Sequence, residues 1–167
     1  LRSNHISAIF EDNSGIIWFA TYGGGIQRYR KSENYFNNHI KWRDDDSGLS
    51  NDIVLSLSQY RDEIWIGTYR GLNIYNRKNN SYRRFFHEPK NPRSISNNII
   101  RYIFPDGENR VLIGTDGGLN IFDSKTETFT TYSHQPGNKD SISSNTVRTI
   151  FRDKSGNLWI GTDNGIN

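Results

Sequence analysis

The sequence predicts an all-β fold, namely a β-propeller segment of about three and a half four-stranded blades from a larger propeller. Three observations predict it. The chain is rich in aromatic residues, with nine Tyr, nine Phe and four Trp beside 15 Gly in 167 residues. It repeats itself every 47 residues, and each repeat holds several short strand signals. Strand-forming residues divided by frequent turn residues favour many short strands over helices.

The repeat is defined by one column of large apolar residues. Its members are Trp18, Trp65, Leu112 and Trp159, which follow one another at steps of 47 residues. The same step links three further columns, which are Ile6, Ile53, Ile100 and Val147; Phe10, Leu57, Phe104 and Phe151; and Thr21, Thr68, Thr115 and Thr162. The blades are therefore expected at residues 1–48, 49–94 and 95–141, with a half blade at 142–167.

Four strand signals follow one another within a unit. The first is a run such as 147–151, the second the WIGT run at 65–68, the third GLNIY at 71–75 and the fourth an aromatic run at 82–85. Four strands in a unit of this length favour a propeller blade, because each blade is a four-stranded sheet. A β-solenoid is the alternative, although its repeats are usually shorter and lack four separate hairpin signals.

The scaffold alone explains most repeated residues. A small residue after the Trp-Ile pair fits where the blade narrows toward the axis, at Ala20, Gly67, Gly114 and Gly161. The glycines after the Thr column suit tight turns with positive φ, at Gly25, Gly71, Gly118 and Gly165. The Trp column is expected to pack between neighbouring blades.

The turn of the first hairpin carries an Asp in three of the four units. Asp12, Asp106 and Asp153 are expected to accept hydrogen bonds from their own turn backbone. The second unit has Gln59 in this place and Asp62 where the other turns have Gly or Asn. Its first hairpin is therefore expected to be built differently.

Several function classes have no basis in the sequence. Cys is absent, which excludes disulfides and thiolate metal sites. The run of Asp44, Asp45 and Asp46 lacks the spacing of a calcium loop, and no G-x-S-x-G motif occurs. We therefore expect no metal, no cofactor and no enzyme activity in this segment. The 21 basic and 18 acidic residues are interspersed, so nucleic-acid binding is not expected. No apolar stretch approaches the ~20 residues of a membrane span, so no membrane contact is expected.

The chain begins at Leu1 in the middle of a repeat and stops after the second strand signal of the fourth unit. A propeller covers its blade faces by closing into a ring. We therefore expect that the chain is part of a longer one, and that the rest of the propeller and of the parent chain are its partners.

The string ISSNTVRTIFRDKSGNLWIGTDNGIN at 142–167 resembles the two-component regulator propeller repeat, whose pattern is roughly SLSSNxVxxIxxDxxGxLWIGTxxGLN. It recurs as LRSNHISAIFEDNSGIIWFATYGGGI at 1–26 and as ISNNIIRYIFPDGENRVLIGTDGGLNIF at 95–122, and more loosely at 49–75. The resemblance covers essentially the whole chain, and it implies paired seven-bladed propellers in the periplasmic part of a Bacteroidetes-type hybrid two-component sensor. It further implies an oligosaccharide ligand, a histidine kinase farther along the parent chain, and a homodimer of the full receptor.

A ligand is expected at the face where the loops after the WIGT strands and the loops between blades come together. The columns that vary there include the residues after the Thr, which are Tyr22, Tyr69, Asp116 and Asp163, and also Arg70. The interblade loops add Trp42, Arg43, His87 and Lys90. Trp42 could stack on a sugar or anchor its loop, and the cations could bind acidic sugar groups or be solvated surface charge. His87 repeats as His134, which points to a loop hydrogen bond rather than to catalysis.

Three functions are weighed. The leading hypothesis is ligand sensing by a periplasmic receptor. The alternative is a protein-interaction scaffold that docks partners on its loops and blade edges. A propeller glycosidase or polysaccharide lyase is the third, and it is disfavoured because no acid or base departs from the repeat in a convincing way.

Overall fold

The computed structural model describes residues 3–32, 35–39 and 47–167. Within these ranges, antiparallel strands form four sheets, each made from strands that are consecutive in the chain, and we call the sheets blades 1 to 4. Blade 1 holds β1 (Ile6–Glu11), β2 (Ile17–Thr21), β3 (Gly25–Arg30) and β4 (Tyr35–His39). Blade 2 holds β5 (Val54–Tyr60), β6 (Glu63–Thr68), β7 (Gly71–Asn76) and β8 (Ser81–Phe85). Blade 3 holds β9 (Ile100–Pro105), β10 (Arg110–Thr115), β11 (Gly118–Asp123) and β12 (Thr128–Tyr132), and blade 4 holds β13 (Val147–Arg152), β14 (Leu158–Thr162) and β15 (Gly165–Ile166).

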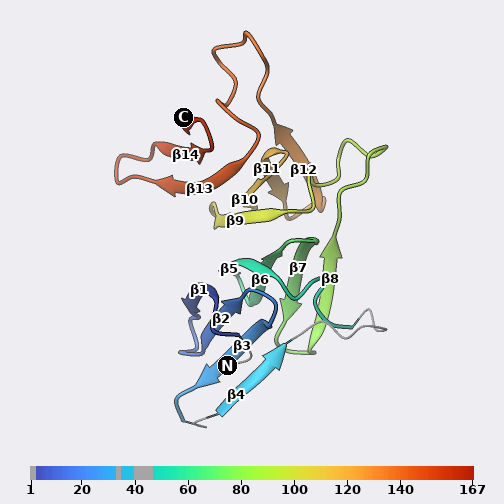
Figure 1. Cartoon of the computed structure of the whole chain (residues 1–167), viewed down its shortest axis with the longest axis vertical. Helices are drawn as coiled ribbons and strands as arrows, with labels where there is room; N and C mark the ends of the chain where they lie inside the picture. The colour runs from blue at the N-terminus through green and yellow to red at the C-terminus, as the bar shows by residue number, and fades with distance from the viewer. Residues whose placement is uncertain (1–2, 33–34, 40–46) are drawn as a thin grey trace.

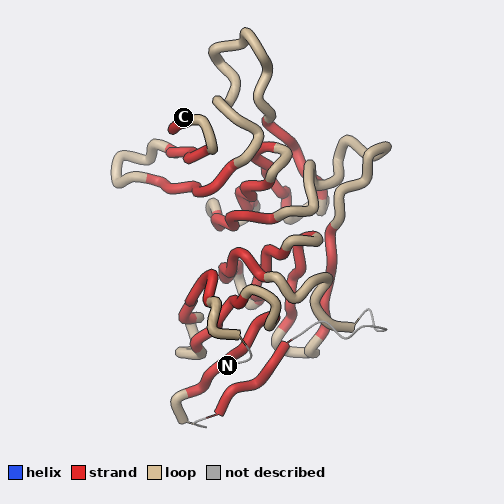
Figure 2. The backbone as a smooth tube through the Cα atoms, in the orientation of Figure 1, coloured by secondary structure: helices blue, strands red, loops and turns tan. Residues whose placement is uncertain are grey.

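The blades are arranged around an arc (Figure 1). The first strands β1, β5, β9 and β13 lie on the inner side, where each contacts the next, and β4, β8 and β12 lie on the outer side. Strands and loops make up the whole described chain (Figure 2). The predicted all-β propeller is thereby confirmed, with three four-stranded blades. The fourth unit does not stop after its second strand as expected, because Gly165–Ile166 form the short third strand β15.

The core lies between successive blades. Trp18 of blade 1 packs edge-on against Tyr75 of blade 2, with ring centroids 6.0 Å apart. Trp65 of blade 2 packs in the same way against Phe122 of blade 3, at 5.1 Å. Both Trp side chains are fully buried, so the predicted packing role of the Trp column is confirmed for these two positions. In this chain Trp159 is 47% exposed.

Gly67 and Gly114 lie where one blade meets the backbone of the next. A Cβ on Gly67 would lie 2.8 Å from the carbonyl oxygen of Ile100, and a Cβ on Gly114 would lie 2.8 Å from that of Val147. Carbon and oxygen do not approach so closely without repulsion. The Cβ on Gly67 would also meet Ser56 Oγ of its own blade, so the space is limited there by both blades.

The structure corrects two of the sequence columns in blade 2. The residue that pairs with Thr68 is Val54 rather than Ile53, and the residue that pairs with Trp65 is Ser58 rather than Leu57. The first hairpin of blade 2 is one residue shorter than the others, since Trp18 pairs with Phe10 across a longer turn. The stretch before β5 is one residue longer in return. The extra residue there and the missing residue in the hairpin cancel, so Trp18 and Trp65 remain 47 residues apart.

The turn Asp of the first hairpin has the predicted role in blades 1 and 4. Asp12 Oδ1 accepts hydrogen bonds from the backbone N–H groups of Ser14 and Ile16 at 2.8 and 3.2 Å. Its Oδ2 accepts from Trp18 Nε1 at 2.8 Å, and Asp153 binds Trp159 Nε1 in the same way at 2.9 Å. In each of these two blades, one carboxylate therefore links the hairpin turn to the Trp side chain.

Blades 2 and 3 depart from this arrangement. In blade 2 a turn of two residues, with Arg61 at φ 56°, replaces the longer Asp turn, as the sequence predicts in part. No carboxylate is left for Trp65, whose buried Nε1 has no hydrogen-bond partner among the described residues. In blade 3 the prediction for Asp106 is wrong. Its carboxylate binds Arg110 and Arg152 instead of its own turn backbone, at 2.7 and 2.6 Å.

No helix in the described part of the chain is long and apolar enough to cross a membrane.

Candidate functional site

The candidate site lies at the end of the blades where the second strand of each blade turns into the third. We call it the rim and define it by the turns 22–24, 69–70, 116–117 and 163–164, together with one residue from each first strand. The loops between blades meet the rim, as predicted: Tyr69 N–H donates to the carbonyl of Ile53 at 3.0 Å, and Gly71 N–H to that of Asn98 at 2.7 Å.

A β-bulge places one side chain of each first strand at the rim. The pairing register shifts near the start of every first strand, so that one residue of each has no partner on the second strand. Bulges redirect a side chain and recur beside functional sites. The bulged residues are Ser7, Leu55, Arg101 and Arg148, and all four line a hollow of about 440 Å³ along the inner strands.

In blades 3 and 4 the rim is ionic. Arg101 makes a two-point ion pair with Asp116, in which Nη2 lies 2.8 Å from Oδ2 and Nε binds Oδ1. Arg148 pairs with Asp163 in the same geometry, at 2.5 Å from Nε and 3.0 Å from Nη2. Such fork-shaped pairs fix the orientation of both groups.

The two pairs differ in exposure. The side chains of Arg101 and Asp116 are 19% and 21% exposed, whereas those of Arg148 and Asp163 are 49% and 46% exposed. The hydrogen bonds that Arg148 donates to Asp163 hold the pKa of Asp163 below its usual value, and the same bonds raise the pKa of Arg148. The Asp163 carboxylate is therefore ionised at neutral pH and presents acceptor oxygens at the rim.

In blades 1 and 2 the rim is aromatic. Tyr22 and Tyr69 occupy the turn positions that Asp116 and Asp163 hold in the other blades, and both are nearly half exposed. Tyr22 stacks on His5, with ring centroids 5.4 Å apart and an interplanar angle of 27°. The bulge carries Ser7 or Leu55 here, which offers no cation to pair with a carboxylate.

Buried Asn side chains hold the loops between blades in place. Asn73 Oδ1 accepts from the backbone N–H of Ser50 at 2.8 Å, and Asn120 Oδ1 from that of Ser96 at 2.9 Å. Each Asn also donates to the hydroxyl of the same Ser at 2.8 Å. Backbone groups that would otherwise be unpaired are thereby satisfied, and the loop enters each first strand at a fixed position.

The structure brings together only some of the predicted site residues. Tyr22, Tyr69, Asp116 and Asp163 lie on the rim, and Arg70 follows Tyr69 in the same turn with an exposed side chain. Trp42 and Arg43 fall outside the described residues.

His87 and Lys90 lie in the loop between β8 and β9, which extends on the outer side of the molecule (Figure 1). His87 Nδ1 lies 2.9 Å from the carbonyl oxygen of Ile95, and His134 Nδ1 lies 2.8 Å from that of Ile142. These are the loop hydrogen bonds that the repeat of the His predicts. The backbone N–H of His87 donates to Asn98 Oδ1 at 2.7 Å, but no interaction among the described residues joins the side chain of His87 or Lys90 directly to a rim residue.

Sequence reasoning missed Arg101 and Arg148 as rim residues. A signal existed, because the two Arg lie 47 residues apart, while the first two units have no Arg at this position. The bulge that redirects their side chains toward Asp116 and Asp163 is not visible in the sequence.

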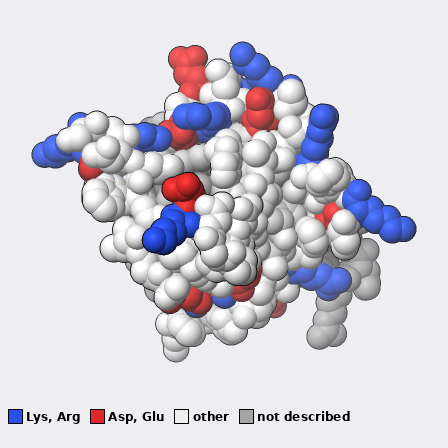
Figure 3. Space-filling view, turned by 90° about the horizontal axis from the view of Figure 1, so that it is seen from above, with Lys and Arg blue, Asp and Glu red and all other residues white. Residues whose placement is uncertain are grey.

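The charged side chains of the rim are mostly paired. Asp116 and Asp163 bind Arg101 and Arg148, and Arg70 is a third cation with an exposed side chain. Seen from above, Lys and Arg side chains are spread over the surface of the molecule with Asp and Glu between them (Figure 3). No group of three or more potential metal ligands is found in residues 3–32, 35–39 and 47–167. The rim therefore offers paired donors, acceptors and aromatic rings.

Residues 1–23 and 141–164 match the family model of the two-component regulator propeller. The resemblance derived from the repeats is confirmed by these segments and by the structural neighbours. None of the curated proteins matches the sequence.

The structure is similar to the extracellular domain of the putative hybrid two component system BT4673 from B. thetaiotaomicron, with a TM-score of 0.81 and 29% identity over 99% of this chain and 21% of that one. For the extracellular domain of BT3049 from the same organism, the TM-score is 0.76 and the identity 24%, over 99% of this chain and 28% of that one. For an ancestral GH74 enzyme, the TM-score is 0.68 and the identity 16%, over 99% of this chain and 22% of that one. The last two show the propeller fold alone, and this chain spans between a fifth and a third of each structure.

Proposed function

Because the chain carries two-component regulator propeller repeats, we propose that it is a ligand-sensing propeller segment in the extracytoplasmic ectodomain of a two-component sensor. Its ligand is an oligosaccharide that binds in the periplasm, and the parent receptor, acting as a homodimer, passes the signal to a histidine kinase. The similarity to the extracellular domain of a putative hybrid two component system at 29% identity supports the receptor context. The rim supports the ligand class.

One observation carries the ligand class: the rim combines exposed aromatic rings on blades 1 and 2 with two-point Arg–Asp pairs on blades 3 and 4. A sugar has apolar C–H faces, which stack on aromatic rings, and hydroxyl groups, which both donate and accept hydrogen bonds. An Arg–Asp pair presents donors and acceptors side by side, so it can bind two neighbouring hydroxyls without a net charge. A site with a few placed polar groups beside apolar surface is typical of small-molecule recognition.

The rim is suited to binding rather than to glycoside hydrolysis. Hydrolysis needs one carboxylic acid that stays protonated near neutral pH. The hydrogen bonds from Arg148 lower the pKa of Asp163, which is the opposite shift. We therefore propose a receptor segment and not an enzyme.

The test is calorimetry of the protein against a panel of oligosaccharides, with the Tyr69→Ala variant beside wild type. The matched control is Tyr132→Ala, which removes a similarly exposed Tyr, 52% against 42% for Tyr69, from the outer strand β12. We expect at least one oligosaccharide to bind wild type and Tyr132→Ala with the same affinity and Tyr69→Ala about tenfold more weakly, because a stacking contact is lost. Absence of binding to every sugar, together with tight binding to a protein partner, would overturn the proposal in favour of an interaction scaffold.

A further inference from the structure

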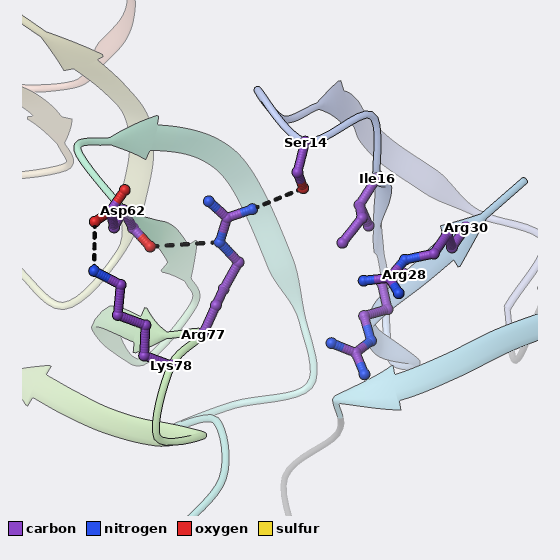
Figure 4. Close-up of a pocket in the computed structure, with 7 residues that line it drawn as sticks. All are labelled: Ser14, Ile16, Arg28, Arg30, Asp62, Arg77 and Lys78. Atoms are coloured by element: carbon purple, nitrogen blue, oxygen red, sulfur yellow. Dashed lines mark hydrogen bonds and ion pairs between the residues drawn. The ribbon is translucent and has the colours of Figure 1, made fainter. Parts of the chain in front are cut away.

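A second hollow lies at the other end of the strands, between blades 1 and 2. It measures about 300 Å³ and is bordered by the turns of the first hairpins and by the turn between β7 and β8 (Figure 4). Its lining residues are Ser14, Ile16, Arg28, Arg30, Asp62, Arg77 and Lys78. The hollow shares none of these residues with the rim.

The described lining of this hollow holds four cationic side chains and one carboxylate. The carboxylate is that of Asp62, which is largely exposed and binds Lys78 Nζ at 2.8 Å. Arg77 binds a second carboxylate outside the lining, that of Asp12, whereas no ion pair of Arg28 is found among the described residues. Arg28 and Arg30 come from β3 of blade 1, and in Figure 4 they face Arg77 of blade 2 across the hollow.

The guanidinium of Arg77 is held rigidly at the edge of the hollow. Its Nη1 lies 2.7 Å from Oδ2 of the buried Asp12 and 3.1 Å from Ser14 Oγ. Its Nε donates to the backbone carbonyl of Asp62 at 3.4 Å. An Arg that is fixed at several points loses little further conformational freedom when it binds an anion.

Arg28 is also oriented, but by a neutral partner. With the Asn37 amide turned so that its oxygen faces Arg28, this oxygen accepts from Arg28 Nη2 at 3.0 Å and from Nε at 3.3 Å. This contact positions the guanidinium and leaves its positive charge uncompensated by that partner. Like charges on the two walls of the hollow repel one another, and an anion between them relieves the repulsion.

The equivalent hollow between blades 2 and 3 shows that this surplus is not a general property of the repeat. It measures about 320 Å³ and has three cations, Arg61, Lys78 and Arg83, against three carboxylates, Asp62, Glu63 and Glu127. Arg83 is bound by both Glu63 and Glu127. The two hollows thus have similar volume but different charge.

We propose that the hollow between blades 1 and 2 is an oxyanion site that binds a sulfate or carboxylate group, separate from the rim. The donors offered from the two blades are the remaining N–H groups, those of Arg28 Nη1 and Arg77 Nη2, and guanidinium groups suit planar or tetrahedral oxyanions. Arg30 and Lys78 add positive charge at the mouth. An anion bound there would join blade 1 to blade 2 through both walls of the hollow.

The test is a titration of the protein with sodium sulfate, with chloride replaced so that the ionic strength stays constant, followed by amide chemical shifts. We expect saturable shifts in residues 12–16 and 76–78, and about tenfold weaker binding in Arg28→Gln, because a two-point contact to an oxyanion is lost. Arg28→Lys keeps the charge and should give an intermediate loss. The control Arg83→Gln, in the balanced hollow, should bind sulfate as wild type does.

The source of the anion is tested with glucose 6-sulfate. Tighter binding than that of both free sulfate and glucose would show a sugar substituent, whereas binding equal to that of sulfate would show a site for a free anion. Shifts that do not saturate, or equal affinity in wild type and in a folded Arg28→Gln or Arg28→Lys protein, would overturn the proposal. If no oligosaccharide binds at the rim of the wild-type protein while sulfate still binds in the hollow, the proposed function fails and the oxyanion site stands.

Discussion

The two halves of the rim share one backbone and differ in chemistry. Blades 1 and 2 place Tyr22 and Tyr69 in the turn and Ser7 and Leu55 in the bulge, whereas blades 3 and 4 place Asp in the turn and Arg in the bulge. In the ionic half, the turn and bulge residues therefore form one unit, since each Arg binds the Asp of its own blade. The repeat supplies the positions, while the departures from it supply the chemistry.

The largest expected effect tests whether both halves rest on the same packing. Gly67→Ala and Gly114→Ala should each lower the free energy of unfolding by about 1–3 kcal/mol, because the added Cβ meets a backbone oxygen of the next blade. The measurement is urea unfolding of both variants. Blade 1 already has Ala20 at this place, so Ala20→Gly is the control and should cost no more than about 1 kcal/mol. A large loss in one Gly variant and none in the other would contradict a shared scaffold.

The next effect separates the two ion pairs of the ionic half. Asp116→Asn leaves Arg101, which is only 19% exposed, without its carboxylate, and should cost about 1–2 kcal/mol of stability after allowance for solvent screening. Asp163→Asn, at the more exposed pair, should cost clearly less. Urea unfolding of the two variants gives the order. The reverse order would mean that exposure does not govern the difference.

A smaller effect is the pH dependence of the exposed pair. The pKa of Asp163 is lowered in the folded protein, chiefly by the hydrogen bond from Arg148. Its contribution to stability is therefore present above the unfolded pKa of about 3.9 and is lost as the pH falls through the folded pKa. As the pH falls below about 4, the melting temperature of wild type should drop more steeply than that of Asp163→Asn. Parallel curves would show that this pair does not contribute to acid sensitivity.

The smallest effect on stability is expected in the aromatic half. Tyr22→Ala and Tyr69→Ala remove exposed side chains, so each should change the free energy of unfolding by no more than about 0.5 kcal/mol. The same urea measurement serves here. A loss above ~1 kcal/mol at Tyr69 would assign this residue to the scaffold instead of the binding surface.

Much of the fold could be predicted because the repeat makes each strand visible several times. The Trp, Thr and Gly columns gave the strand order and the blade packing. The register of β5 could not be predicted, because the insertion before it and the deletion in its hairpin cancel at Trp65. A fixed step of 47 residues thus concealed a shift of one residue at Val54.

The site was predicted only in part, for a related reason. The turn residues Tyr22, Tyr69, Asp116 and Asp163 follow a clear Thr column, so their shared place could be inferred. In the strands of Arg101 and Arg148 the buried residues are three positions apart, because a bulge breaks the usual alternation of a strand. Nothing in the residue types marks where the extra residue falls.

We expect both halves of the rim to bind one and the same ligand. This claim is tested most directly by calorimetry with the best-binding oligosaccharide on wild type, Tyr69→Ala, Arg148→Gln and the double variant. We predict that each single variant binds about tenfold more weakly. The double variant should lose at least as much binding free energy as the two single variants lose together. Wild-type affinity in both single variants would contradict the claim and remove the rim as the binding site.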